Sequence, residues 1–75
     1  MAQEALLRRR EVERRTGNGR SVIYDLMARN LFPKQVSIGP RAVAWVESEV
    51  NAWVAARIAE RDHGRDAEGE PPRAA

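Results

Sequence analysis

The chain has 75 residues, with 13 Lys or Arg, 11 Asp or Glu and no cysteine, which indicates one small domain and excludes disulfides and cysteine metal ligands. Residues 1–45 carry nine of the basic and four of the acidic residues, a net charge of +5, whereas residues 46–75 have a net charge of −3. The longest apolar run, Ala42 to Val46, is far shorter than the roughly 20 residues that cross a bilayer, which predicts a soluble, cytoplasmic protein with no membrane partner.

A first short helix is predicted at residues 9–15, with Gly17 ending it in a left-handed conformation. We expect its buried contacts to come from Leu6, Leu7 and Val12. Five arginines lie within eight positions around it: Arg8, Arg9, Arg10, Arg14 and Arg15. They could form exposed ion pairs with Glu11 and Glu13, as surface charge runs usually do, or contact phosphates, for which we name Arg10 and Arg14.

A second helix is predicted at residues 20–29. A helical period places one arc of side chains toward a core: Val22, Ile23, Leu26 and Met27. The opposite arc begins at the helix N-terminus and holds Arg20, Ser21, Tyr24, Asp25 and Ala28. Arg20 can bind guanine or phosphate through its forked donors, and Ser21 can reach either, so this arc is typical of a recognition helix. The alternative is an ordinary amphipathic surface helix, since Asp25 would repel phosphates. Asp25 could still orient Arg20 or Arg29, or accept from a cytosine amino group.

The next segment predicts a two-stranded hairpin. Asn30 is a plausible left-handed end for the second helix, and Pro33 prevents its continuation. Four apolar residues are expected to share one face of the hairpin: Val36, Ile38, Val43 and Trp45. Gly39 and Pro40 would form a type II′ turn with Gly39 first. Lys34, Ser37 and Arg41 remain outside, either facing solvent or forming a wing that contacts phosphates or the minor groove.

The last helix is predicted from Val46 or Glu47 to Arg61. Its apolar stripe contains Val46, Val50, Trp53 and Val54, with Arg57 on its line and Ile58 at its border. We interpret Trp45 and Trp53 as packing residues, with the stem of Arg57 laid over them. The same stripe could instead serve a second subunit, because the alanines on the other side of the helix allow close helix contact. From Asp62 onward the sequence lacks apolar periodicity, so we predict a domain of residues 1–61 and a disordered tail of residues 62–75.

These elements predict a mostly helical fold with a small β-hairpin, a winged helix-turn-helix. An enzyme is not indicated: the single histidine, His63, lies in the predicted tail, the serines have no base at usable spacing, and no glycine-rich phosphate loop is present. The same scarcity of ligands predicts no metal site and no cofactor. The competing class is a protein-interaction module, such as an adaptor or antitoxin-like subunit, on a winged-helix scaffold.

Several short segments form a recognisable pattern: Leu6-Leu7, Glu11-Val12, Thr16-Gly17, Arg20-Ser21-Val22-Ile23-Tyr24, Phe32-Pro33-Lys34-Gln35-Val36, Gly39-Pro40-Arg41-Ala42-Val43-Ala44-Trp45 and Glu49-Val50 to Trp53. Together they resemble the AlpA-type phage and prophage regulators over about residues 6–57. The resemblance implies a MerR-like winged helix-turn-helix that regulates integrase transcription or, as in related excisionases, bends DNA and sets the direction of recombination. It places Arg20, Ser21 and Tyr24 on the recognition helix and Arg41 in the wing. The implied partners are double-stranded DNA, further copies of the chain on DNA, and integrase or RNA polymerase.

The chain departs from the family pattern at a few positions. Arg15 stands where an apolar residue is common, Asn18-Gly19 stands where an apolar residue precedes a capping serine, and Asn30 replaces a usual glycine. Glycine caps a helix nearly as well as serine, so the second helix should still begin there. Arg15 and Asn18 predict looser packing of the first helix on the second, and a larger basic surface.

Overall fold

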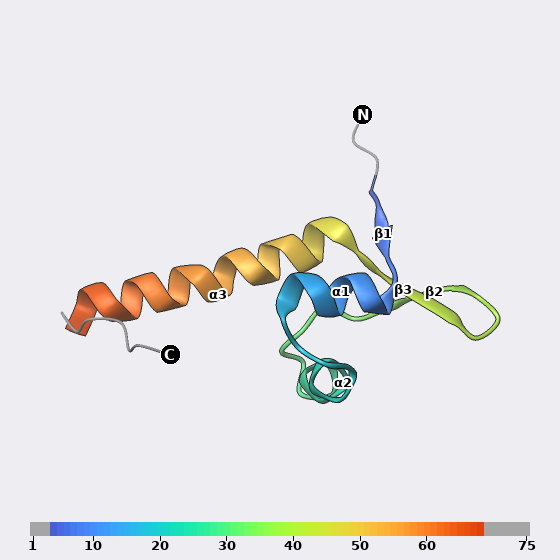
Figure 1. The fold of residues 1–75 in the computed structure, drawn as a ribbon, viewed down its shortest axis with the longest axis horizontal. Helices are drawn as coiled ribbons and strands as arrows, with labels where there is room; N and C mark the ends of the chain where they lie inside the picture. The colour runs from blue at the N-terminus through green and yellow to red at the C-terminus, as the bar shows by residue number, and fades with distance from the viewer. Residues whose placement is uncertain (1–3, 69–75) are drawn as a thin grey trace.

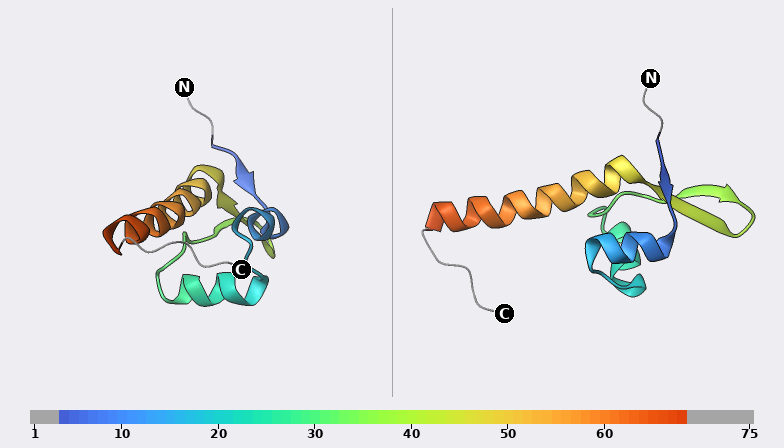
Figure 2. Two further views of the ribbon diagram at one scale, coloured as in Figure 1. Left: turned by 60° about the vertical axis from the view of Figure 1, so that its left-hand side comes forward. Right: turned by 45° about the horizontal axis from the view of Figure 1, so that its top comes forward.

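In the computed structural model, which describes residues 4–68, the chain forms helices and a small antiparallel sheet whose hairpin extends away from the helices (Figure 1). The elements in chain order are β1 (Leu6–Leu7), α1 (Arg9–Thr16), α2 (Arg20–Ala28), β2 (Val36–Gly39), β3 (Ala42–Val46) and α3 (Glu47–Glu68). The β2–β3 hairpin and the far end of α3 project to opposite sides of the body (Figures 1 and 2). The mostly helical fold with a hairpin is as predicted and is consistent with a winged helix.

The sheet has a strand that the sequence analysis did not predict. Its order is β1-β3-β2, and β1 pairs with β3 through Leu6 opposite Val46 and Leu7 opposite Trp45. A strand alternates its side chains between two faces, so Leu7 is buried while Leu6 remains 46% exposed, which corrects the expectation that both are buried. The Glu47 amide donates to the Ala5 carbonyl at 2.8 Å and extends this pairing to the start of α3.

The hairpin turn differs from the predicted type II′ turn. Its central residues are Pro40 and Arg41, and Arg41 has a φ of 59°, whereas Gly39 does not have a positive φ. Proline fixes its own φ near −65°, which suits the second residue of a type I or II turn and leaves a positive φ to the residue after it. A negative φ at Pro40 followed by a positive φ at Arg41 is the pattern of a type II turn, in which glycine usually occupies the place of Arg41.

The hairpin register also corrects the predicted apolar face. Val36 lies opposite Ala44, and Ser37 lies opposite Val43. Residues directly opposite each other in an antiparallel pair point to the same face, so Val36 lies on the other face from Val43 and Trp45. Ile38 occupies the irregularity between Ser37 and Gly39 and is exposed. The hairpin thus contributes to the core mainly through β3.

The core takes one or two buried side chains from nearly every element. They are Leu7 of β1, Val12 of α1, Ile23 of α2, Phe32 of the following loop, Ala44 and Trp45 of β3, and Val50 of α3. Leu26 and Met27 of α2 pack against this cluster as predicted, but Val22 is 47% exposed and does not belong to it. Because each element supplies so little, the core depends on all of them at once.

The two ends predicted for the first helices are confirmed. Gly17, at the end of α1, has a φ of 75°, and its amide donates to the Glu13 carbonyl at 2.8 Å. Asn30, just after α2, has a φ of 61°. Asparagine is among the few residues other than glycine that adopt this conformation readily. Gly17 therefore sets the direction in which the chain turns from α1 to α2, and Asn30 sets the direction in which it leaves α2.

The last helix, α3, extends to Glu68, past the end predicted at Arg61. Residues 62–68 include strong helix formers, and the single glycine among them costs only about 1 kcal/mol, so the helix continues through the start of the predicted tail. His63 consequently lies on α3. The rest of the tail, residues 69–75, lies outside the described residues. That residues 1–61 form the complete folding unit remains a prediction.

Trp53 attaches α3 to the loop that follows α2. Its ring packs edge-on against Phe32 with centroids 5.0 Å apart, and its Nε1 donates to the Leu31 carbonyl at 2.7 Å. The guanidinium of Arg57 lies over the Trp53 ring at 5.0 Å, whereas the prediction placed its stem over both tryptophans. Trp53 is half-buried, however, and Trp45 is the tryptophan that is fully enclosed.

Candidate nucleic-acid interface

A groove lined by arginines lies where the starts of α1 and α2 meet the hairpin. Its volume is about 570 Å³, and its lining residues are Arg8, Arg9, Arg10, Arg20, Tyr24, Arg41 and Val43. None of them is acidic. Four of the predicted site residues, Arg10, Arg20, Tyr24 and Arg41, are thus brought together from three separate segments of the chain. We refer to the seven lining residues as the arginine groove.

Most of the charge in the arginine groove is uncompensated. Arg9 pairs with Glu13 at 2.9 Å, but Arg8, Arg10, Arg20 and Arg41 form no ion pair with any residue in the described range. Guanidinium groups that have no carboxylate partner keep their donors available and produce a positive potential in the hollow between them. The groove is therefore suited to a ligand with several negative charges, such as the phosphates of a nucleic acid.

The helical period predicted that Tyr24 lies on the free face of α2, but its side chain is only partly exposed. It is half-buried and packs edge-on against Trp45, with ring centroids 6.2 Å apart and planes at 72°. Its ring also lies beneath Arg20, whose guanidinium carbon is 5.3 Å from the ring centroid. Tyr24 thus belongs both to the core and to the groove.

Asp25, the acidic residue on α2, pairs with an arginine outside the arginine groove. Asp25 pairs with Arg29 one turn further along the helix, with Nε and Oδ2 3.2 Å apart. Of the two arginines that Asp25 was predicted to orient, Arg20 and Arg29, it pairs with Arg29 in the structure. The negative charge that argued against a recognition helix is therefore partly neutralised on α2 itself.

The other predicted site residues lie outside the arginine groove. Ser21 and Lys34 are exposed, Ser21 next to Arg20 on α2 and Lys34 in the loop before β2. Arg14 lies along a second hollow beside the α1–α2 turn, together with Arg9, Arg10 and Glu13. It is paired with Glu11, as one of the two interpretations predicted, and contact of Arg14 with phosphate stays a prediction.

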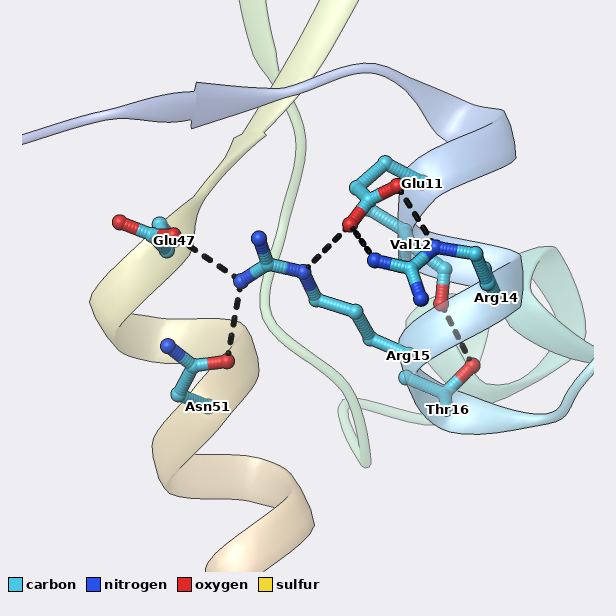
Figure 3. Close-up of polar contacts among 7 residues, drawn as sticks. All are labelled: Glu11, Val12, Arg14, Arg15, Thr16, Glu47 and Asn51. Atoms are coloured by element: carbon cyan, nitrogen blue, oxygen red, sulfur yellow. Dashed lines mark hydrogen bonds and ion pairs between the residues drawn. The ribbon is translucent and has the colours of Figure 1, made fainter.

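Arg15 has a structural role that sequence reasoning missed. Its Nε donates to Glu11 at 2.8 Å, and its Nη1 donates to Glu47 at 3.0 Å and to Asn51 at 3.3 Å, so it joins α1 to α3 (Figure 3). The hydrogen bond from Arg14, followed by that from Arg15, lowers the pKa of Glu11 to about 2. The same contacts raise the pKa values of both arginines. The only signal in the sequence was the spacing of Glu47 and Asn51 by one helical turn.

Arg8 and Arg9 line the groove, although they were not among the DNA contacts predicted from the sequence. Three consecutive arginines, Arg8 to Arg10, begin at the N-cap of α1, and all three line the groove although they are adjacent in sequence. In residues 4–68, no helix is long and apolar enough to cross a membrane, and no group of three or more His, Asp or Glu residues is placed to hold a metal ion.

The neighbouring helices α1 and α2, the β2–β3 hairpin and the basic groove between them are consistent with a small winged-helix protein. The family described as prophage CP4-57 regulatory protein (AlpA) matches residues 5–58. The chain therefore belongs to the AlpA family of prophage regulatory proteins, and the resemblance stated from its motifs is confirmed.

Two relatives extend this comparison. The chain is 51% identical over 67 residues to the uncharacterized protein ORF88 of Enterobacteria phage P4, covering 89% of this chain and 76% of that protein. It is 33% identical over 58 residues to the DNA-binding transcriptional activator AlpA of Escherichia coli strain K12, covering 69% of this chain and 83% of that protein. No solved structure matches the chain.

Proposed function

We propose that this protein is a double-stranded DNA-binding regulator of a prophage or other integrative element, with a MerR-like arrangement of recognition helix and wing. The observation that carries the proposal is the convergence of Arg8, Arg10, Arg20 and Arg41, all without ion-pair partners in the described chain, on one groove. Three separate segments supply them. The name of the Escherichia coli relative, a DNA-binding transcriptional activator, supports the same function.

The proposed mode of binding follows from where these residues lie. Arg20 and Ser21 occupy the exposed N-terminal end of α2, and the major groove of B-DNA is wide enough to admit a helix that presents such residues to base edges. Arg41 lies at the tip of the hairpin, where it would contact the backbone or the minor groove. Arg8 and Arg10 would contact phosphates of the strand that passes between the helix and the wing.

A footprint on the element's own DNA tests this proposal. We expect the protein to protect sites in the integrase promoter or in the attachment region. Protection upstream of the integrase start would indicate a transcriptional regulator, and protection of repeated sites inside the attachment region would indicate an excisionase. RNA polymerase or integrase would then be the protein partner to test.

The salt dependence of binding separates this function from a protein-interaction module. A protein that neutralises phosphates releases the counterions bound to them, so with about four phosphate contacts its affinity should fall by roughly 10² between 50 and 200 mM salt. Absence of protection on either DNA region, together with weak binding that does not depend on salt, would contradict the proposal and favour an adaptor or antitoxin-like subunit.

A further inference from the structure

The side chain of Arg20 is held by a single contact that leaves its donors unused. Its guanidinium lies over the Tyr24 ring, and it forms no hydrogen bond or ion pair with another residue of the described chain. Arg20 is otherwise exposed at the first position of α2. A free arginine side chain at such a position loses considerable rotamer entropy when it binds, and a contact that restricts it beforehand reduces that loss.

Tyr24 is itself fixed by the core. Its ring packs edge-on against Trp45, which is fully buried on β3, and β3 is paired on both sides, with β1 and with β2. Arg20, Tyr24 and Trp45 therefore form a continuous series of side-chain contacts from the exposed end of α2 to the middle of the sheet. The tyrosine hydroxyl has no hydrogen-bond partner in residues 4–68.

We propose that Tyr24 is a positioning residue that orients the Arg20 guanidinium for reading a base, and that its ring, not its hydroxyl, performs this role. This inference rests on the proposed function. It differs from the prediction made from the sequence, in which Tyr24 itself contacts DNA. The two alternatives require different atoms: positioning needs an aromatic ring between Arg20 and Trp45, whereas a direct contact needs the hydroxyl.

A double-mutant cycle between Arg20 and Tyr24 tests the inference. Dissociation constants are measured on the duplex that the wild-type footprint identifies and on a scrambled duplex of equal length. Tyr24→Phe keeps the ring and should bind both duplexes like the wild type. Tyr24→Leu removes the ring and should weaken binding to the specific duplex by about two- to fivefold, the fold-change that corresponds to an exposed cation–π contact. It should leave binding to the scrambled duplex unchanged.

The decisive comparison is made in the Arg20→Ala background, where a positioning residue has nothing left to position. There, Tyr24→Leu should have no further effect on the dissociation constant. An equal loss in both backgrounds would overturn the positioning role while leaving the proposed DNA face intact. A loss with Tyr24→Phe as large as that with Tyr24→Leu would show that the hydroxyl contacts DNA directly. Arg20→Ala binding both duplexes like the wild type would overturn the positioning role, because Arg20 would then read no base, while the DNA face would still be tested by Arg41→Ala.

Folding must be controlled because Tyr24 packs against the core. Tryptophan fluorescence and urea denaturation of each variant establish that it is folded at the temperature of the binding assay. If Tyr24→Leu is not folded, Tyr24→Met replaces it, since a flexible apolar side chain fills irregular space with less strain. The expected coupling with Arg20 is the same for this variant, and its absence would likewise overturn the inference.

Discussion

At the scale of single residues, the arginines of this chain divide by whether they have a carboxylate partner. Arg14 and Arg15 are bonded to Glu11, and Arg15 is bonded to Glu47 as well, so their charge holds α1 in place. Arg20 and Arg41 have no such partner within the described residues and face the groove. Neighbouring residues of the same type thus serve stability in one case and, as we propose, binding in the other.

The ion pairs of Glu11 predict a pH dependence of stability. The pKa of Glu11 is lowered from 4.5 to about 2 in the folded chain, so the folded state favours the ionised carboxylate. The resulting stabilisation is fully present above about pH 4.5 and is lost as the pH falls toward about 2. We expect wild type to lose more unfolding free energy than Glu11→Gln between these pH values, as measured by urea denaturation.

Glu49→Gln is the matched control for that measurement. Glu49 lies in the first turn of α3 and forms no ion pair with a described residue, so this variant removes one carboxylate charge without breaking an ion pair. Its pH dependence should parallel that of the wild type. A Glu11→Gln variant whose stability falls with pH just as steeply as that of the wild type would show that the Glu11 pairs do not stabilise the fold.

The two tryptophans should differ in their contributions to stability. Trp45 is fully buried, so Trp45→Ala should cost about 3–5 kcal/mol and unfold a domain of this size. Trp53→Phe keeps the contact with Phe32 but loses the hydrogen bond to the Leu31 carbonyl, which should cost about 0.5–1.5 kcal/mol. Thermal denaturation of both variants measures this order, and a folded Trp45→Ala variant with an unchanged Tm would contradict the core described here.

At the scale of elements, two glycines test the turn assignments. Gly17 has a φ of 75°, and a Cβ there would meet no other atom within 4 Å, so Gly17→Ala should cost about 1–2 kcal/mol through the backbone conformation alone. Gly39 has no positive φ, and its Cβ would lie at an ordinary distance of 3.9 Å from the Ala42 Cβ. Gly39→Ala should therefore be neutral or stabilise by up to about 1 kcal/mol.

Urea denaturation of the two alanine variants distinguishes the observed turn from the predicted one. In a type II′ turn, Gly39 would need a positive φ, and Gly39→Ala would then cost as much as Gly17→Ala. That result would contradict the hairpin geometry. In a type II′ turn, Arg41 would also not need its positive φ. The position of Arg41 at the tip of the hairpin depends on the turn formed by Pro40 and Arg41.

The sequence predicts those elements well that are determined by local chemistry. Gly17 and Asn30 end their helices where the pattern indicates, because left-handed residues act within one turn. The predicted apolar face of β2 was wrong because an irregularity at Ile38 shifts the pairing register between β2 and β3. Alternation of apolar residues alone cannot reveal such a shift. The bond from Arg15 to Glu47 spans 32 positions, and no local pattern encodes a contact of that separation.

The candidate site could be predicted from the sequence only in part. Sequence periodicity placed Arg20 at the start of a recognition helix and Arg41 in the wing, but it could not show that both line one groove with Arg8 and Arg10. Nor could it show that Tyr24 reaches Trp45, since a half-buried side chain lies at the border of a helical face. Such juxtapositions are set by how the elements pack, and they decide which arginines remain free.

At the scale of the whole molecule, the central claim is that the arginine groove binds DNA. The salt dependence of DNA binding tests this claim most directly. Dissociation constants of Arg20→Ala, Arg41→Ala and Arg61→Ala are measured on a specific and a scrambled duplex at several salt concentrations. Arg61 lies on α3, far along the chain from the groove, and its replacement removes the same charge. It is therefore the control for an unspecific effect of net charge.

Arg41→Ala should weaken binding to both duplexes and reduce the magnitude of the slope of log K against log salt by about one, because one phosphate contact is lost. Arg20→Ala should cost about 1–3 kcal/mol on the specific duplex and little on the scrambled one. Arg61→Ala should match the wild type. Were all three variants to bind both duplexes with wild-type affinity and slope, the groove would not be the DNA surface, and a protein-interaction module would be the better description of this chain.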